Sequence, residues 1–177
     1  MRLNPAANVH RLAHLHTIQM ASLPQQTSAD LSTNPAFFAL LTQSYERLVG
    51  KPLVPRGADV AWLYRDAPFA VLAHDTSADP CFIYANKTAQ ARFGYSWEEF
   101  LAIPSRLSAE PQDRAERQAL LDAVSRDGFH TGYRGVRVGK GGRRFLIEDG
   151  VVWELIDPAG TRHGQAATFA TWRDIGV

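Results

Sequence analysis

The C-terminal part of the chain most constrains the fold, because it is rich in β-forming residues divided by glycine turns. The strand-like segments there are residues 133–138, 144–148, 151–156 and 165–172. Two shorter apolar runs, residues 69–73 and 81–85, come earlier in the chain, and helical patterns separate them from the later strands. This order favours an α+β domain with one antiparallel sheet and helices on one of its faces.

The pair Asp149–Gly150 leaves one part of this order open. It stands between the strand-like segments 144–148 and 151–156. An Asp-Gly pair is typical of a tight hairpin turn, which would make these segments two strands. The same pair is also compatible with a bulge inside one long strand.

Capping residues mark a first helix over residues 34–49. Asn34 suits the N-cap, Pro35 suits the first helical position, and Gly50 offers a stop. The apolar stripe of this helix comprises Phe38, Leu41, Tyr45, Leu48 and Val49. Such a stripe suits either dimerisation or packing on the sheet.

Four further helical segments are expected. A short one runs from about residue 58 to 64, and another follows Asn86 to residue 93. Ser96 and Glu99 form the capping box S-x-x-E, with Tyr95 and Phe100 placed for a hydrophobic staple. Residues 114–127 predict a longer helix that ends at a glycine.

Composition excludes several classes of protein. The 177 residues are 45% hydrophobic and 21% charged, which fits a domain with a packed core. A formal net charge of +1 argues against a generic nucleic-acid binder. One cysteine, Cys81, cannot form an intramolecular disulfide. Neither a membrane-spanning run nor a secretory signal is evident, so we expect a cytoplasmic protein without membrane partners.

Residues 1–33 differ from the rest of the sequence. They carry few charges and include a run of small polar residues from Ser22 to Asn34. We therefore expect an N-terminal arm, disordered or partly helical, followed by a single domain over residues 34–177. Met20 is a candidate for the native start of the protein, which would place the first nineteen residues outside it.

The arm also carries three histidines. His10 and His14 are four residues apart and would share one face of a helix, and His16 is close by. No acidic residue accompanies them, and we expect no physiological metal site here.

Few residues suggest catalysis. His74 stands beside Asp75 at the end of a predicted strand, and such a pair can orient a base. We favour a simpler role for His74, a hydrogen bond to the backbone, because no nucleophile accompanies the pair. Arg106 and Glu110 are four residues apart and would pair if helical.

Three arginines, Arg137, Arg143 and Arg144, cluster on neighbouring predicted strands. Together they would suit a carboxylate or phosphate if any of them points inward. Their alternation with apolar neighbours favours the solvent-exposed face instead.

The segment Phe82-Ile83-Tyr84-Ala85-Asn86, followed by Phe93-Gly94-Tyr95-Ser96, resembles the centre of PAS domains, which are five-stranded sensory modules. The sequence is more similar to the MEKHLA family, a PAS-like group found in plant homeodomain-leucine zipper proteins and as small bacterial proteins. The similar stretches are residues 63–74, 79–86, 104–111, 133–137, 142–145, 152–153 and 164–169.

The resemblance implies a sheet of strand order 2-1-5-4-3, with a pocket between the sheet and the helices of residues 86–127. The ligand-binding candidates it suggests are Tyr84, Asn86, Phe93, Trp97, Arg106, Arg137, Trp153 and Gln165. The aromatic candidates would equally fill a core, and Asn86 would equally serve as a helix cap.

The resemblance further implies a sensory or regulatory domain that binds a small molecule or a protein partner. The ligand would be a small aromatic or anionic molecule. The cysteine motif of flavin-adduct photosensors is absent, and the 114–127 helix has no histidine for haem, so we expect neither cofactor. Haem would need His74 or His130 instead. The signal would pass to another protein or through a homodimer formed by the 34–49 helix. The alternatives are a small enzyme using His74, Asp75 or Arg137, and a ligand-free structural adaptor.

Overall fold

The computed structural model describes residues 30–176 of the chain. Most of the predicted arm lies outside this range, including Met20 and the histidines His10, His14 and His16.

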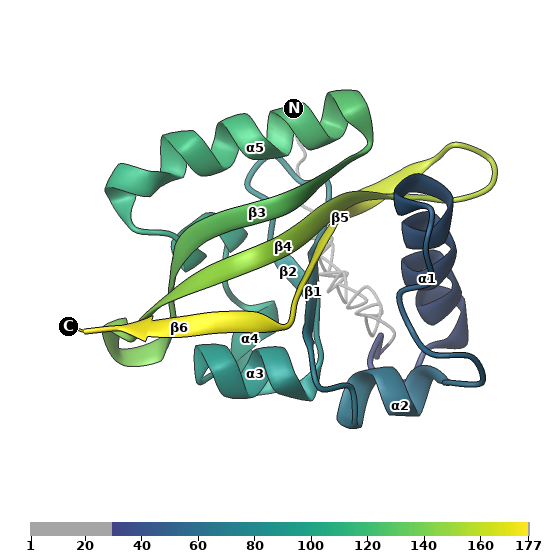
Figure 1. Ribbon diagram of the computed structural model, residues 1–177, viewed down its shortest axis with the longest axis horizontal. Helices are drawn as coiled ribbons and strands as arrows, with labels where there is room; N and C mark the ends of the chain where they lie inside the picture. Colours follow the sequence, from purple (N-terminus) through teal and green to yellow (C-terminus); the bar gives the residue numbers. More distant parts are fainter. Residues whose placement is uncertain (1–29, 177) are drawn as a thin grey trace, which may run out of the picture.

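The core of the structure is one antiparallel sheet (Figure 1). Its strands are β1 (Ala70–His74), β2 (Phe82–Ala85), β3 (Phe129–Val138), β4 (Arg144–Ile156), β5 (Arg162–Phe169) and β6 (Thr171–Ile175). The spatial order β2-β1-β5-β4-β3 confirms the order that the resemblance implied. The additional strand β6 pairs with β4 beyond the end of β5.

The predicted strand over residues 165–172 is two strands in the structure. The chain bends at Ala170, so that β5 pairs with the second half of β4 and β6 pairs with the first half. β4 itself bends at the same level, and its neighbour must follow it to keep the ladder of hydrogen bonds. A run of β-forming residues in the sequence does not reveal such a bend.

Asp149 and Gly150 form a bulge in the single long strand β4. Tyr133 pairs with Gly150 and Gly135 pairs with Ile147, so β4 holds one residue more than β3 between these pairs. Asp149 has a φ of 54°, which is the left-handed conformation that Asp tolerates better than most residues. The bulge was one of the two alternatives that the sequence left open.

Capping residues set the helix ends as predicted. The Asn34 side chain accepts a hydrogen bond from the Phe37 amide at 3.0 Å at the start of α1 (Pro35–Val49). Both hydrogen bonds of the predicted capping box are present at α4 (Trp97–Leu101). The other helices are α2 (Val60–Arg65), α3 (Lys87–Phe93), α5 (Arg114–Asp127) and the short 3-10 turns η1 (Ser105–Ser108), η2 (Pro111–Asp113) and η3 (Lys140–Gly142).

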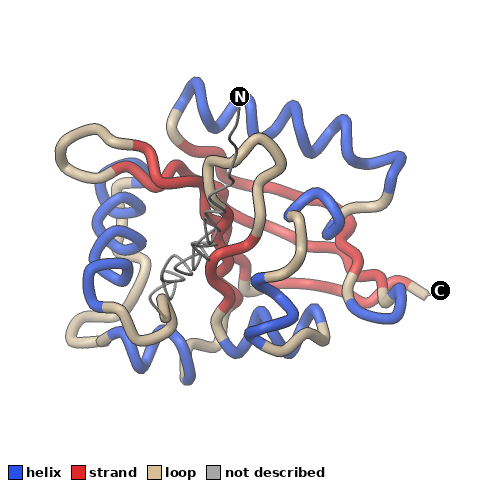
Figure 2. Tube along the Cα trace, turned by 180° about the vertical axis from the view of Figure 1, so that it is seen from behind, coloured by secondary structure: helices blue, strands red, loops and turns tan. Residues whose placement is uncertain are grey.

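Successive side chains of the strands enter two apolar clusters on opposite faces of the sheet. Val71 and Ala73 of β1 belong to the cluster under α1, whereas Ala70 and Leu72 belong to the cluster with α3 and α4. α5 lies along β3 and β4, and α1 lies beside the other end of β4 (Figure 1). Seen from behind, the segment between α4 and α5 passes in front of the strands (Figure 2).

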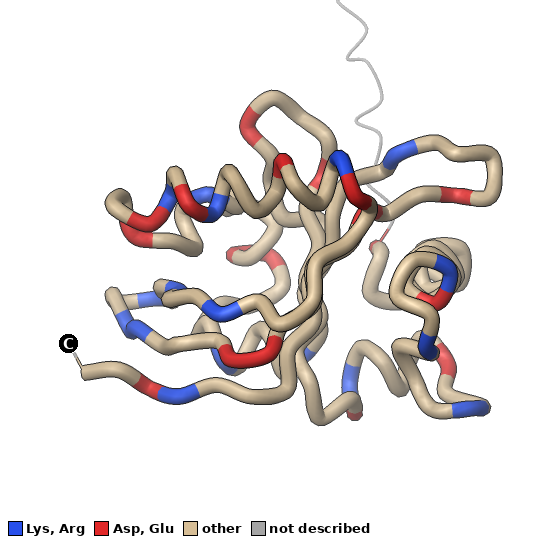
Figure 3. Tube along the Cα trace, turned by 45° about the horizontal axis from the view of Figure 1, so that its top comes forward, with Lys and Arg blue, Asp and Glu red and all other residues tan. Residues whose placement is uncertain are grey.

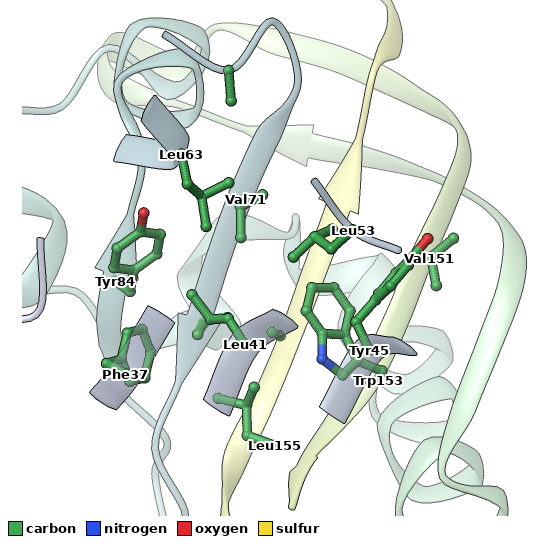
Figure 4. Packing of buried hydrophobic residues seen from close by; sticks show 13 residues of the cluster. Phe37, Leu41, Tyr45, Leu53, Leu63, Val71, Tyr84, Val151, Trp153 and Leu155 are labelled. Atoms are coloured by element: carbon green, nitrogen blue, oxygen red, sulfur yellow. The ribbon is translucent and has the colours of Figure 1, made fainter. Parts of the chain in front are cut away.

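The cluster under α1 accounts for the apolar stripe predicted on this helix. Leu41 and Tyr45 are buried against the sheet, and the Tyr45 ring meets the Trp153 ring edge-on at 4.9 Å (Figure 4). The Trp153 Nε1 donates a hydrogen bond to the Ser44 Oγ at 3.1 Å. Of the two uses expected for the stripe, packing on the sheet is the one seen within the chain.

Acidic and basic residues are interspersed along α5 and the strands (Figure 3). Among residues 30–176, no helix has both the length and the apolar character needed to cross a membrane.

Candidate functional site

A cavity of about 50 Å³ lies between the sheet and the helices α3 and α5. Such a volume is room for about three water molecules, or for a ligand of a few non-hydrogen atoms. Most of its wall is apolar, with side chains that include Leu72, Phe82, Phe93, Leu121, Ile147 and Phe169. The polar side chains of the wall are His74, Ser108, Arg117, Tyr133, Arg137, Gln165 and Thr168.

One side of the cavity is formed by alternate residues of β3. Tyr133, Gly135 and Arg137 are two apart and therefore share a face of the strand. A Cβ at Gly135 would stand 1.9 Å from the Tyr133 hydroxyl, so only glycine lets the tyrosine ring lie over this position. The Arg137 guanidinium lies over the same ring, 5.0 Å from its centre. The sequence Tyr-x-Gly-x-Arg thus folds the arginine onto the tyrosine.

The opposite side of the cavity is formed by α5, which contributes Arg117. The Arg117 Nη2 donates a hydrogen bond to the Ser105 Oγ at 3.0 Å, which fixes the side chain across the segment before α5. Burial and the nearby charge of Arg137 lower the pKa of Arg117 to about 10. At neutral pH Arg117 is therefore still a cation.

Neither buried arginine has an acidic partner. Arg117 is 9% exposed and Arg137 is 8% exposed. Among the described residues, every ion pair within 4.0 Å uses other side chains. The Arg137 Nη1 donates to the Val136 carbonyl at 2.8 Å, and burial lowers the pKa of Arg137. Buried charges in proteins are usually paired, so two unpaired cations beside one cavity are a costly arrangement.

His74 ends β1 at the edge of the same cavity. Its Nδ1 lies 2.8 Å from the Asp75 carbonyl oxygen, which can only accept, so the proton of the neutral ring is on Nδ1. The Nε2 atom is then an acceptor, and it is buried without a partner. Burial is the largest influence on the pKa of His74 and lowers it. The simpler role predicted for His74, a backbone hydrogen bond, is confirmed.

The side chains of His74 and Asp75 do not form a catalytic pair. The Asp75 carboxylate accepts hydrogen bonds from the Ser77 hydroxyl at 2.6 Å and from the Cys81 amide at 3.0 Å. It therefore holds the β1–β2 loop instead of orienting the imidazole. These bonds lower the pKa of Asp75 against the opposing effect of burial.

Gln165 of β5 closes the cavity next to His74. Its Nε2 donates to the Leu121 carbonyl at 3.0 Å and to the Glu154 Oε1 at 2.7 Å. Its Oε1 atom is buried without a partner. The Glu154 carboxylate itself lines a neighbouring cleft that opens to the outside, together with Arg162 and Gln165.

Three of the eight residues predicted to bind a ligand line the cavity, namely Phe93, Arg137 and Gln165. The alternation of the strand predicted that Arg137 lies on the solvent-exposed face, and this prediction was wrong. Its neighbour across the sheet is Phe145, which is fully buried, and both residues point toward the helices.

The other five predicted residues lie elsewhere. Tyr84 and Trp153 belong to the opposite cluster, under α1 (Figure 4), and Trp97 packs against Tyr84 at a ring distance of 5.9 Å. Asn86 is fully buried but saturated. It accepts from the amides of Val71 and Ala89, and it donates to the carbonyls of Leu63 and Phe69.

Arg106 is exposed and does not pair with Glu110. The expected pair depended on a helix through both residues, but η1 ends at Ser108. Arg106 instead forms two hydrogen bonds with Asp79, at 3.0 and 3.1 Å. Glu110 pairs with Arg144 at 2.9 Å.

The sequence reasoning missed Arg117 and Tyr133. A signal for Tyr133 was present, because Tyr133, Gly135 and Arg137 alternate within one of the stretches that carried the resemblance. Arg117 had no such signal, since an arginine in the first turns of an amphipathic helix is usually exposed.

Neither Cys81 nor His130, which the sequence offered as the alternative haem ligand to His74, lines this cavity. Cys81 stands before β2, bridged to Pro104, and its thiol faces the Asp79 carbonyl at 3.6 Å. His130 belongs to a groove between α5 and β3.

Two comparisons concern the sequence. A family model described as the MEKHLA domain matches residues 35–174. A comparison with curated proteins found no match.

Solved structures with a similar fold include sensory domains of several organisms. The PAS domain of a protein from Colwellia psychrerythraea has a TM-score of 0.55 at 22% identity, and the match covers 65% of this chain and 92% of that one. A fungal LOV domain photoreceptor has a TM-score of 0.52 at 20% identity, covering 84% and 95%. The light-state dimer of the fungal photoreceptor Vivid has a TM-score of 0.51 at 19% identity, covering 71% and 90%. These likenesses show the PAS fold.

Proposed function

The chain belongs to the MEKHLA-domain family, and from this we propose that it is a sensory or regulatory domain that binds a small molecule in the cavity beside α5. The change on binding would pass to another protein or to a second copy of the chain. The observation that carries the proposal is the cavity wall, which combines an apolar lining with buried polar atoms that have no partner within the described residues. Such atoms cost free energy unless a ligand satisfies them.

Light sensing through a flavin adduct is not part of this proposal, although two of the similar structures are photoreceptors. An adduct needs a cysteine thiol at the cavity. Cys81, the only cysteine of the chain, lies outside the wall of this cavity.

Self-association through α1 stays a prediction. The buried side chains Phe37, Leu41 and Tyr45 are already used inside the chain. A second copy would have to use the partly exposed side chains Phe38, Leu40 and Leu48 of the same helix. Light scattering on the 177-residue protein tests this, and a monomer at all working concentrations would leave signalling to a different protein.

Native mass spectrometry of the freshly purified protein tests ligand binding. We expect a mass above that of the denatured chain, and we expect the variant Ala167→Leu to lose it. Ala167 lines the cavity, so the larger side chain fills the space. The control Ala159→Leu adds the same atoms on the exposed turn after β4 and should keep the extra mass.

The result that contradicts the proposal is equally clear. If the parent protein and both variants show only the mass of the chain and bind no added small molecule, the domain is a structural adaptor with a filled core. Turnover of a bound compound that is lost in His74→Gln would indicate the enzyme alternative instead.

A further inference from the structure

Four polar side chains of the cavity fall into two types, donors and acceptors. Arg117 and Arg137 supply N–H donors and positive charge, whereas the His74 Nε2 and the Gln165 Oε1 supply acceptors without partners. All four side chains are nine-tenths or more buried. A ligand that satisfies them needs an anionic acceptor group for the arginines and an O–H or N–H donor for the acceptors.

We propose that the ligand is a small hydroxycarboxylate, whose carboxylate binds Arg117 and Arg137 and whose hydroxyl donates to His74 or Gln165. This rests on the proposed function, because it names the class of molecule for the same cavity. A carboxylate is the planar group that a guanidinium fork matches best. The apolar wall then contacts the carbon body of the ligand, and the volume of about 50 Å³ limits that body to a few atoms.

Acidic side chains of the protein do not take the place of the ligand. Asp113 and Glu116 act on Arg137 through their charges and share with Arg117 and Arg137 the groove between α5 and β3, but they do not line the cavity, and neither forms an ion pair with either arginine within 4.0 Å. Glu154 is committed to Gln165 and lines the neighbouring cleft. The wall of the cavity itself therefore offers the two arginines no carboxylate.

Arg117 also connects the cavity to the outside. It lines the cavity, the cleft beside the β1–β2 loop and the groove between α5 and β3. A charged side chain at this junction meets an incoming anion before it reaches the apolar wall. The same residue thus serves both attraction and binding of the carboxylate.

Three small probes test the proposal by calorimetry on the intact protein: glycolate, which is the smallest hydroxycarboxylate, its neutral amide glycolamide, and acetate, which lacks the hydroxyl. We expect glycolate to bind, and each of the other two to bind about tenfold or more weakly. Amide resonances of cavity residues such as Leu121 and Val152 should shift on binding. Shifts confined to surface arginines would overturn the inference.

The variant Arg137→Met should remove the preference for the acid over its amide. Arg134→Met is the matched control, because Arg134 is on the same strand but is 65% exposed, and it should keep the preference. If Arg137→Met does not fold, Arg137→Lys decides. It keeps the charge but loses the fork, so we expect weaker binding of the acid and unchanged binding of the amide.

The outcomes separate the two proposals. If the amide binds as tightly as the acid, the cavity binds small molecules without preferring a negative charge. In that case only the hydroxycarboxylate inference is wrong. If acetate binds as tightly as glycolate, the hydroxyl assignment is wrong. If no probe shifts the cavity resonances, the hydroxycarboxylate inference falls, whereas the proposed function falls only if native mass spectrometry also shows no mass beyond that of the chain.

Discussion

At the scale of single residues, a buried polar side chain either stabilises the fold or lines the site, and Asn86 stabilises the fold. The Asn86 carboxamide caps α3, accepts a hydrogen bond from the Val71 amide of β1, and donates one to the Leu63 carbonyl in α2. Its four hydrogen bonds are all buried or partly buried. No polar atom of Asn86 is left for a ligand, so its role is structural.

We expect Asn86→Ala to lower the free energy of unfolding by about 3 kcal/mol, because it leaves several buried backbone groups without partners. Asn34→Ala is the matched control. Asn34 caps α1 with one hydrogen bond at a partly exposed position, so its loss should cost about 1 kcal/mol. Urea unfolding measures both, and equal costs would contradict the structural role of Asn86.

His74 makes stability depend on pH. Its pKa is lowered in the folded protein, so the unfolded chain binds a proton more readily than the folded one. The free energy of unfolding should therefore decrease as the pH falls below about 6.5, the ordinary pKa of histidine. His74→Gln should flatten the curve below about pH 6.5, the region in which the unfolded histidine takes up its proton. The control His163→Gln, at the exposed start of β5, should keep the slope. A slope that survives in His74→Gln would show that another group causes it.

At the scale of elements, β4 joins the two faces of the molecule. In its first half Phe145 and Ile147 point toward α3 and the cavity side. In its second half Trp153 and Leu155 belong to the cluster under α1, Val152 lines the cavity, and Val151, next to the bulge, contacts both. Before the bulge the odd-numbered residues of β4 face the cavity side. After the bulge the extra residue has shifted the alternation, so that the even-numbered Val152 faces the cavity.

The left-handed backbone at Asp149 is the element's most sensitive point. Asp149 is exposed, so a substitution there tests the backbone without changing the core. We expect Asp149→Val to lower the free energy of unfolding by about 1–2 kcal/mol, because a β-branched residue is strained at this φ. Asp149→Gly should be at least as stable as the parent, and a loss in that variant would contradict the explanation.

α1 is part of the core and not an appendage. Leu41 is fully buried against the sheet, whereas Leu107 on η1 is 44% exposed. We expect Leu41→Ala to cost about 3 kcal/mol of unfolding free energy and Leu107→Ala about 0.5 kcal/mol or less. Similar values for the two variants in urea would mean that α1 does not stabilise the domain.

At the scale of the whole molecule, the arrangement of elements could be predicted from the sequence. Local chemistry set both ends of α1, the start of α4 and the C-terminal end of α5, because caps act within one turn of the helix. The strand order came from the resemblance to PAS-like domains, since pairing between distant strands leaves little local trace in a single sequence.

The site could be predicted only in part, because it depends on which face each side chain occupies. Tyr84 and Trp153 are large aromatic residues of the sheet, as a ligand pocket requires, but they serve the opposite cluster. Arg117 is a cation in a helix and gave no sign of burial. Composition and spacing do not distinguish these cases, whereas the packing of α1 and α5 on the sheet does.

The bulge in β4 has a consequence for anyone who aligns relatives of this chain. An alignment that places a one-residue gap at Asp149 still matches apolar residue to apolar residue on both sides of the gap. In a relative without that residue, plain alternation along the strand would keep the equivalents of Val152 and Trp153 on the faces they occupy here, whereas a gap placed elsewhere in β4 would exchange those faces for the residues between the gap and the bulge. Ligand positions should therefore be transferred between relatives separately for the two halves of this strand, each half counted from its own end.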